Sequence, residues 1–333
     1  MKLIARIADA SDPEAIIEAA HIIRKGGLVA FPTETVYGLG ADAENPVAIT
    51  RIFEAKRRPR IDPLIVHVAD IESARRYGNF PDVALPLMER FWSGPLTLVA
   101  DKTSVVPSIV TAGLDTVAVR VPAHPAALAL IRAAGCAIAA PSANPFGYVS
   151  PTEARHVAEQ LGDAVDLILD GGPCQVGVES TIVSFEASGP VILRAGGTPV
   201  EALQSVIGCT GIQIGSVARP SVPGQMKRHY STMTPLDIIE ISESSDDAPG
   251  VGIGGIKEER IGLLTLSLME DAARYVAVEI LSPSGDLREA AAGLFSALRR
   301  LDALSLDRIV ARPIPENGLG LAIMDRLRRC SIR

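Results

Sequence analysis

The first 207 residues alternate between two hydrophobic patterns, one of helical period and one of short continuous apolar runs. The helical pattern predicts helices at residues 12–25, 45–56, 151–161 and 199–207. The apolar runs, bounded by Gly, Pro or polar residues, predict strands at residues 28–31, 64–68, 96–100, 117–121, 137–140, 167–169, 180–185 and 191–194. Because strands and helices alternate, we expect residues 1–207 to form an α/β domain.

Residues 208–235 interrupt this alternation with a stretch rich in Gly, Pro, Ser and Thr. No acidic residue lies between Glu201 and Asp237, yet this stretch includes Arg219, Lys227, Arg228 and His229. A plain linker is one interpretation. The one-sided charge favours another, a segment that lies over an anionic ligand near a protein surface.

A second α/β pattern follows in residues 236–333. It predicts strands at residues 237–241, 262–266 and 275–279, and amphipathic helices at residues 286–300 and 319–329. About 100 residues are enough for a small domain of its own. The chain is therefore predicted to hold two domains, 1–207 and 236–333, joined by the segment 208–235.

The composition narrows the class of protein. Of 333 residues, 47% are hydrophobic and 21% are charged, which excludes a disordered chain. The formal net charge of −7 excludes a protein that attracts nucleic acid through its bulk charge, so any nucleotide or RNA must meet a local cluster of cations. No apolar run reaches the roughly 20 residues that span a bilayer, and the early acids and proline are unlike a signal peptide. We expect no membrane association and a cytoplasmic location.

The best-known sequence signatures of metal and nucleotide sites are absent or out of context. Four scattered cysteines form no CxxC pair, so neither a metal site nor a disulfide framework is predicted. Residues 250–255 match GxGxxG, but they follow an acidic serine-rich stretch instead of a strand, which favours a loop. The sequence holds no GxxxxGK[ST], GxSxG or HExxH.

Three polar segments follow predicted strands or helices and are candidates for a ligand site. The first, at 31–40, offers Thr, Glu and Tyr side chains directly after a strand. The second, at 56–60, has four cations in five residues, held on a rigid path by prolines and suited to a triphosphate. The third, at 140–144, ends a buried strand. Each segment also has a purely structural interpretation. The polar residues at 31–40 and 140–144 could form turns and helix caps, and the cations at 56–60 could complement a helix dipole.

Two arginines lie inside strand-like runs, Arg120 in Val-Arg-Val and Arg194 after Ile-Leu. An arginine flanked by apolar residues is rarely buried without an anionic partner. That partner is either an acid of the protein itself or a carboxylate or phosphate of a ligand. Together the segments describe a basic, hydroxyl-lined cavity that can hold a nucleotide and a small carboxylate.

Seven motifs, in order, resemble those of the L-threonylcarbamoyladenylate synthase family. They are FPTETVYGLG, KxRPxxxPLIVH, WSGPLT, VAVRVP, APSAN, GVESTIV and VILRAG. The match covers about residues 10–207, and PGQMKRHYSTMTP with the domain that follows resembles the long, two-domain form. The resemblance implies a YrdC-like twisted open sheet with a positive concave face, followed by a smaller Rossmann-like domain.

The resemblance also implies a reaction and its residues. L-Threonine, bicarbonate (or CO₂) and ATP would give threonylcarbamoyl-AMP and diphosphate. The catalytic cations would be Lys56 and Arg58. The threonine pocket would comprise Thr35, His67, Arg120, Ala140 and Ser180. The ATP-binding residues would be Lys56, Arg58, Asp62, Thr116, Ser142, Asn144, Ser150, Arg194, His229 and Tyr230, the last two from the linker as a lid. Arg57 stands where the family usually has a small residue.

The family's partners follow from the same resemblance. Mg²⁺ would accompany ATP, held by phosphates and water. A tRNA threonylcarbamoyl-transfer complex would then use the product at position 37 of tRNAs that read codons starting with A. Weak RNA binding is a further expectation. Two alternatives stay open: a non-catalytic RNA-binding or ribosome-assembly factor, and a carbamoyltransferase of the hydrogenase-maturation type, which would carry CxxC pairs that this sequence lacks.

Overall fold

The computed structural model describes residues 5–207, 213–214, 222, 230–239, 259–269 and 272–332. The chain divides into two compact units. The first comprises residues 1–146 and 150–226, and the second comprises residues 147–149 and 227–333. The short segment Gly147–Val149 therefore groups with the second unit, which the sequence pattern did not predict. The division into 1–207, 208–235 and 236–333 stays a prediction beside this grouping.

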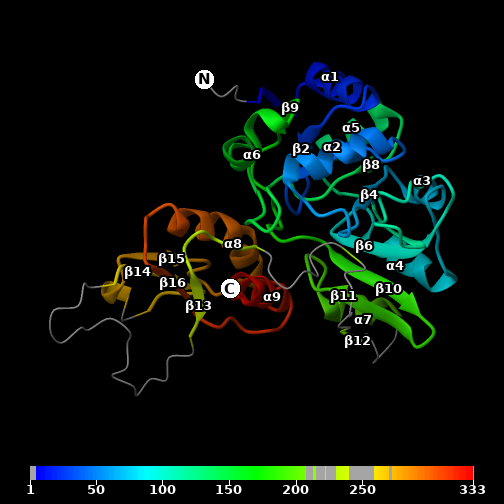
Figure 1. The fold of residues 1–333 in the computed structure, drawn as a ribbon. Coiled ribbons are helices and arrows are strands. Elements are labelled where there is room, and N and C mark those ends of the chain that lie inside the picture. The colour runs from blue at the N-terminus through cyan, green and yellow to red at the C-terminus, as the bar shows by residue number, and fades with distance from the viewer. Residues whose placement is uncertain are drawn as a thin grey trace. The chain divides into compact units, whose positions relative to one another are not determined.

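The first unit is built on a mixed, open sheet of 12 strands within the described residues, shown in Figure 1. The strands run in the order β1-β9-β2-β3-β8-β4-β7-β6-β10-β11-β12, and β5 pairs with β6. Their bounds are β1 Ile7–Asp9, β2 Val29–Phe31, β3 Gly38–Asp42, β4 Ile65–His67, β5 Gly78–Asn79, β6 Leu96–Lys102, β7 Thr116–Arg120, β8 Ile138–Ala139, β9 Leu167–Asp170, β10 Thr181–Glu186, β11 Gly189–Arg194 and β12 Gln213–Ile214.

Helices pack against this sheet, as Figure 1 shows for α1, α2 and α5 near β2 and β8. The helices are α1 Pro13–Arg24, α2 Pro46–Lys56, α3 Ile71–Arg75, α4 Leu85–Phe91, α5 Pro125–Ala134, α6 Ala154–Leu161 and α7 Val200–Ile207, with short 3-10 turns at Asp82–Ala84 and Gly162–Ala164. Asn45 caps α2 by accepting hydrogen bonds from the backbone N–H of Val47 and Ala48 at 3.0 and 3.2 Å. This cap fixes where α2 begins, and so where its last residue, Lys56, lies.

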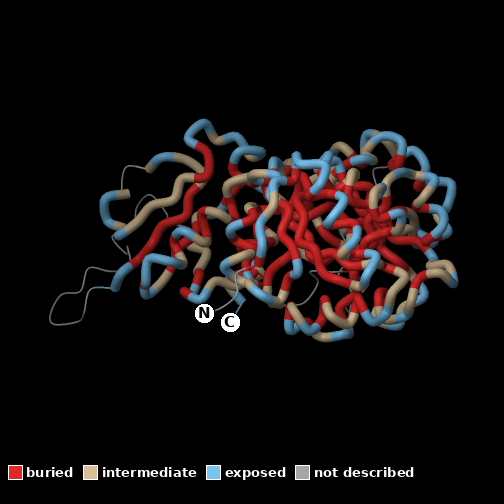
Figure 2. Tube along the Cα trace, turned by 90° about the horizontal axis from the view of Figure 1, so that it is seen from above, coloured by how far each residue is buried: buried red, intermediate tan, exposed pale blue. Residues whose placement is uncertain are grey.

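The strands that carry the polar motifs have two different faces. On β7, Val117 and Val119 point into the main hydrophobic core, and Val66 of β4 joins them there. Because side chains alternate along a strand, the residues between these valines lie on the opposite face. Every residue of β2, β4 and β8 is buried, and Figure 2 shows buried strands through the interior of the chain. The predicted site residues of β4 and β7 therefore lie on the face opposite the main core.

The second unit has a smaller, wholly parallel sheet in the order β13-β16-β14-β15. Its elements are β13 Leu236–Ile238, β14 Ile261–Thr265, a 3-10 turn at Ala272–Arg274, β15 Ala277–Ile280, α8 Leu287–Asp302, β16 Arg308–Ala311 and α9 Gly320–Ser331. Parallel strands linked through helices are typical of Rossmann-like units. The α/β class, the twisted open sheet and the second α/β unit are thus confirmed.

Several elements differ from the sequence pattern. The polar segment 31–40 runs into a strand, β3, which the pattern did not predict. Helices α4 and α5 were also missed, and so was the strand β16. The predicted helix 151–161 begins only at Ala154. In β3 the sequence GLGAD carries no β-branched residue, and the strand forms because it is paired on both sides, by β2 and β8.

Candidate active site

One face of the sheet gathers the predicted threonine-binding side chains. On β7, Thr116, Ala118 and Arg120 share this face because they are two residues apart. The parallel pairing with β4 places Ile65 beside Ala118 and His67 beside Arg120. His67 and Arg120 are both buried, at 4% exposure each. The register of two neighbouring strands therefore brings these two residues together, although 53 positions separate them in the sequence.

Arg120 is held by three acceptors from three different segments. Its Nη2 donates to Glu34 Oε1 at 2.6 Å, its Nη1 to Thr35 Oγ1 at 2.9 Å, and its Nε to the Gly94 carbonyl oxygen at 3.2 Å. Thr35 Oγ1 in turn lies 2.8 Å from Thr33 Oγ1. The protein therefore supplies an internal acid for Arg120, one of the two alternatives that the sequence left open.

His67 is a buried, neutral imidazole on this face. Burial, followed by the charge of Arg120, lowers the pKa of His67 from 6.5 to about 3. Interactions with the backbone of Ile138 and Ile65 act in the opposite direction on this pKa. The His67 Nδ1 atom has no partner of full hydrogen-bond geometry within the described part of the chain. A buried polar atom without a partner is costly, so this nitrogen is suited to a hydrogen bond with a ligand.

The end of α2 turns two cations inward. Lys56 is the last residue of the helix, and Arg57 then adopts a left-handed backbone with a φ of 51°. This turn leaves Arg57 exposed and buries both Lys56 and Arg58, at 1% and 6% exposure. Lys56 and Arg58 thus lie inside the fold and not on a solvated helix end, which argues against a role that only complements the helix dipole.

Asp62 is the carboxylate at the centre of the buried cations. Its Oδ2 lies 2.9 Å from Nη2 of Arg58. Burial raises the pKa of Asp62, and the charges of Arg58, Lys56 and Arg194 act in the opposite direction. Burial, followed by the charge of Arg58, lowers the pKa of Lys56 well below its usual range. The charges of all three cations therefore act on Asp62, and Arg58 pairs with it directly.

Lys56 also fixes the loop that follows β8. Its Nζ donates to the carbonyl oxygens of Ser142, at 2.6 Å, and of Asn144. The Lys56 carbonyl oxygen accepts from the Phe146 N–H at 2.8 Å. The start of this loop is anchored too, because the Ala140 N–H donates to the Ile65 carbonyl oxygen at 2.9 Å. The predicted residues Ser142 and Asn144 therefore lie beside Lys56, and Ala140 lies beside β4.

Arg194 ends β11 and is tied to the start of β10. Its Nε and Nη2 donate to the Ser180 carbonyl oxygen at 3.1 and 3.0 Å, and Nη2 also lies 3.1 Å from Ser180 Oγ. Ser180 Oγ is 2.7 Å from Thr97 Oγ1 on β6. A Cβ atom on Gly196 would lie 2.3 Å from the Glu179 carbonyl oxygen, so only glycine permits this close approach.

A second buried acid lies next to Ser180. Glu179 is 7% exposed, and its Oε1 accepts a hydrogen bond from Ser150 Oγ at 2.5 Å. This bond brings the predicted residue Ser150 beside Ser180, although the two are separated by 30 positions. Ser150, Ser180 and Arg194 therefore form one connected group.

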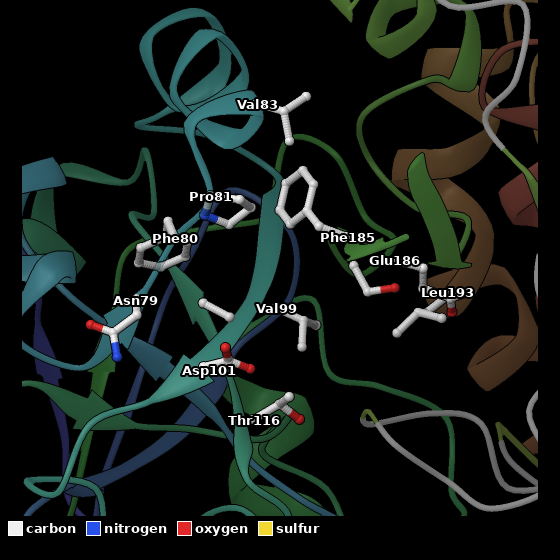
Figure 3. A pocket seen from close by; sticks show the side chains of 12 residues that line it. Asn79, Phe80, Pro81, Val83, Val99, Asp101, Thr116, Phe185, Glu186 and Leu193 are labelled. Carbon is white, nitrogen blue, oxygen red and sulfur yellow. The ribbon is translucent and has the colours of Figure 1, made fainter. Parts of the chain in front are cut away.

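A pocket of about 640 Å³ opens on the same sheet beyond Thr116, as Figure 3 shows. Its lining residues are Asn79, Phe80, Pro81, Val83, Val99, Ala100, Asp101, Thr116, Ser184, Phe185, Glu186 and Leu193. Figure 3 shows Phe80, Pro81 and Phe185 on one side and the polar Thr116 and Asp101 on another. Leu193, which lines this pocket, is the neighbour of Arg194 in the chain, but none of the four buried cations is itself among the lining residues.

The described parts of the linker lie in different units. Val222 is buried in the first unit against Ile65, Val99, Ala118 and Ile182, on the same face as the predicted site. His229 lies outside the described residues.

Tyr230 belongs to the second unit and is 1% exposed. Its ring stacks on Phe295, with centroids 5.6 Å apart, and the Arg326 guanidinium carbon lies 5.2 Å from the centre of the Tyr230 ring.

Comparison with known proteins identifies the family. A family model described as "Telomere recombination" matches residues 21–196, and one described as "Threonylcarbamoyl-AMP synthase, C-terminal domain" matches residues 198–331. The threonylcarbamoyl-AMP synthase of Pyrococcus abyssi is 42% identical, covering 99% of this chain and 98% of the relative. That of Bacillus subtilis is 43% identical, covering 96% and 94%. This chain belongs to the threonylcarbamoyl-AMP synthase family.

Solved structures agree with this assignment to the threonylcarbamoyl-AMP synthases. The crystal structure of P. abyssi Sua5 complexed with L-threonine matches with a TM-score of 0.86 and 40% identity, covering 99% of this chain and 98% of that one. A structure of a double-alanine variant of the same protein also matches with a TM-score of 0.86 and 40% identity, covering 99% and 96%. The two-domain form of the family, which the linker and second domain resembled, is therefore confirmed.

Sequence reasoning found most of the cluster but missed three of its members. The cations and hydroxyls that it selected in the first unit do lie on or beside one sheet face. It did not select Glu34, Glu179 or Thr97, which hold Arg120, Ser150 and Ser180 in place. Both glutamates stand inside the quoted motifs FPTETVYGLG and GVESTIV. An acid within an apolar motif is the signal that would have identified them. The roles of the selected residues stay predictions.

Proposed function

We propose that this chain is an ATP-dependent nucleotidyltransferase that makes threonylcarbamoyl-AMP and diphosphate from L-threonine, bicarbonate and ATP. The observation that carries the proposal is the convergence of four buried cations on one side of the sheet. Asp62 joins Lys56, Arg58 and Arg194, while Thr97 connects this group to Arg120. The β6–β7 register pairs Leu98 with Val119, so the next positions along, Thr97 and Arg120, are neighbours.

At one end of the cluster, Arg120 would receive the carboxylate of threonine. Its planar guanidinium suits a carboxylate. The neutral His67 ring beside it can accept a hydrogen bond from the threonine hydroxyl or donate one to it. A site that satisfies a buried hydroxyl discriminates strongly against an amino acid that lacks one. These two contacts support threonine as the substrate.

At the other end, Lys56, Arg58 and Arg194 would bind the triphosphate. The unprotonated threonine amine attacks the carbon of CO₂ and loses a proton, or attacks bicarbonate with loss of water, and in either case forms a carbamate. A carbamate oxygen then attacks the α-phosphorus, and the bond to the bridging oxygen of diphosphate breaks. Negative charge on the phosphate oxygens increases in this step, so fixed buried cations stabilise the transition state.

The pocket next to Thr116 would take the nucleoside of ATP. Its apolar side, with Phe80, Val99 and Phe185, can cover a flat base, and Thr116 and Asp101 offer polar groups to a ribose. Its position beyond Leu193 supports this choice, because the triphosphate would then extend toward Arg194.

Mg²⁺ would bind to the phosphates and not to a cage of carboxylates. Within the described ranges, no group of three or more His, Cys, Asp or Glu side chains is placed to hold an ion. Asp62, the carboxylate among the cations, is paired with Arg58. An ion that keeps most of its water and bridges phosphate oxygens fits such a site. When bound, it would neutralise part of the charge on the leaving diphosphate.

The product is a mixed anhydride, so a second enzyme must use it. We infer that the tRNA threonylcarbamoyl-transfer complex passes the threonylcarbamoyl group to adenosine 37, and that any contact of this chain with RNA is weak. The alternative of a non-catalytic RNA-binding factor does not explain why Arg120 and His67 are buried side by side. For location, among the described residues no helix has the length and hydrophobicity to cross a membrane. A cytoplasmic site of action is part of the proposal.

The test is diphosphate release from ATP, measured with all three substrates and with each omitted in turn. We expect release that depends on both threonine and bicarbonate. Salt-sensitive RNA binding without any diphosphate release would instead favour the RNA-binding alternative. Diphosphate release that does not depend on threonine would contradict the proposal that Arg120 and His67 bind threonine.

A further inference from the structure

Glu34 has both carboxylate oxygens engaged in the site, although it is not one of the predicted substrate contacts. Oε1 accepts from Nη2 of Arg120 at 2.6 Å, and Oε2 accepts from the Ala123 N–H at 3.0 Å. The Glu34 backbone is fixed as well, because its carbonyl oxygen accepts from the Val176 N–H at 2.8 Å. Glu34 is therefore held from three directions and is only 7% exposed.

This carboxylate sets the plane of the Arg120 guanidinium. Glu34 and Thr35 take one N–H from each terminal nitrogen, and the Gly94 carbonyl oxygen takes the Nε–H. An arginine side chain has several rotatable bonds, so without such acceptors it would have to be ordered when a ligand binds. With them, the guanidinium is already oriented before a carboxylate arrives.

We propose that Glu34 is a positioning residue that determines the affinity of the site for the threonine carboxylate by orienting Arg120. This inference rests on the proposed function, in which Arg120 binds that carboxylate. Glu34 has two opposing effects, since its charge also repels a second carboxylate. Orientation is the larger effect here, because recognition of a planar carboxylate depends on the direction of each N–H.

The central experiment compares wild type with Glu34→Gln. The amide keeps the size of the side chain, but its NH₂ group only donates. One of the two hydrogen bonds, from Arg120 or from Ala123, therefore loses its acceptor. We expect the KM for threonine to rise at least about tenfold, while the KM for ATP changes less than about twofold. A KM for threonine that stays the same or falls would overturn the proposal.

The preference for L-threonine over L-threoninamide is a second measurement. Loosened packing alone would not change this preference. The amide lacks the carboxylate, so the wild-type preference for threonine reports what Arg120 recognises. We expect this preference to shrink by the same factor in Glu34→Gln. An unchanged preference would contradict the proposal even if both activities fell.

A double-mutant cycle tests whether Glu34 acts through Arg120. In an Arg120→Met background, Glu34→Gln should have no further effect on the KM for threonine. A second full loss in that background would show that Glu34 acts by another route and would overturn the proposal.

Two further variants keep the test interpretable. Glu34→Asp retains the charge but is one methylene shorter. It should show a smaller change in the same direction, and it replaces Glu34→Gln if that variant does not fold. The matched control is Glu44→Gln, because Glu44 pairs with Arg76 at 3.0 Å and accepts from Tyr77 at 2.7 Å, away from Arg120. The control should leave both KM values unchanged.

Failure of this inference and failure of the proposed function look different. If wild type releases no threonine-dependent diphosphate, the proposed function is wrong, whatever Glu34 does. If wild type is active and Glu34→Gln binds threonine normally, only the role of Glu34 is wrong.

Discussion

Both units of this protein bury arginines, but they surround them differently. In the first unit, Arg58, Arg120 and Arg194 are 6%, 4% and 6% exposed, and their partners are oxygen atoms on one side of a sheet. In the second unit, Arg326 is 0% exposed and lies on α9. Its guanidinium packs on the Tyr230 ring and pairs with Asp325, the preceding residue, at 2.7 Å.

The difference separates an arginine of a binding site from one that supports the fold. The acid of Arg120, Glu34, is 86 positions away, and it presents Arg120 on a face shared with His67 and Thr116. The acid of Arg326 is its neighbour in the sequence, and an aromatic side chain lies against its cation. Burial alone therefore does not indicate function. The identity and position of the partners do.

The largest effect that follows from this comparison is expected for Arg58→Ala. Removing a fixed cation that stabilises charge in a transition state costs about 100- to 1,000-fold in rate. We expect a loss of this size in diphosphate release, with threonine binding little changed. Arg57→Ala is the matched control, because Arg57 is the exposed neighbour. Equal losses in both variants would mean that overall positive potential matters, and not the buried position.

A smaller effect, on stability instead of rate, is expected for Arg326→Met. The change leaves Asp325 without one partner and removes the cation from the Tyr230 ring, so we expect unfolding to become easier by about 2–3 kcal/mol. Urea unfolding followed by circular dichroism measures this loss.

Diphosphate release by folded Arg326→Met should keep its wild-type KM for threonine. A raised KM for ATP at unchanged stability would instead place Arg326, through Tyr230, with the catalytic machinery, and the comparison between the two units would fail.

The sequence predicted much of the fold because several elements carry strong local signals. Helices α1 and α2 have a side-chain cap and a proline at their first turn, and β4, β7 and β10 are apolar runs. The missed helix α5 has local signals too, with Pro125 at its first turn and Gly135 just after its end. Other features that were missed depend on distant partners. Strand β1 pairs with β9 about 160 residues later, and Gly147–Val149 groups with the second unit. No local pattern specifies such contacts.

The site was predictable in its cations and not in their partners. Arginines within apolar runs stand out in a sequence, because charge is rarely buried without a reason. Which acid pairs with which cation depends on the topology. The sequence left an internal acid and a ligand as alternatives for Arg120, and the structure adds the internal acid, Glu34. An internal acid and a ligand carboxylate bind to arginine in the same way, so Arg120 by itself does not identify the ligand. Only the resemblance of the motifs pointed to threonine.

The two units also differ in how their stability should respond to acid. The pKa of His67 is lowered to about 3 in the folded first unit, whereas an unfolded histidine titrates near 6.5. Between about pH 3 and pH 6.5 the unfolded state therefore binds more protons, up to one, and the free energy of unfolding falls as the pH falls. We expect His67 to account for a loss of about 2 kcal/mol between pH 7 and pH 5. No described residue of the second unit is a histidine.

The single tryptophan, Trp92, lies in the first unit, so its fluorescence during urea unfolding reports on that unit. His67→Gln should flatten the dependence of stability on pH between 5 and 7. The lowered pKa of His124 acts in the same direction and should remain in the variant. A variant with the wild-type slope would show that His67 is not the group responsible.

The smallest effect is expected at Arg57, between the two buried cations. Its φ of 51° is a conformation that glycine adopts more readily than other residues, and it lies just after the last residue of α2, where glycine is most frequent. Glycine relieves the strain of the left-handed backbone but adds entropy to the unfolded chain, which opposes the gain. The net stabilisation of the first unit by Arg57→Gly should be about 0.5–1 kcal/mol. Urea unfolding followed by Trp92 fluorescence measures this gain.

The kinetic side of the same variant tests whether an exposed cation takes part in the site. Because the Arg57 side chain is exposed and its charge is screened, the kcat/KM for ATP at physiological salt should change by less than about twofold. Arg57→Ala removes the same charge without relieving the backbone, so it should show the kinetic effect alone. If both variants lose nearly as much activity as Arg58→Ala, the exposed Arg57 takes part in function. Burial and the identity of the partners would then not be enough to identify the functional cations.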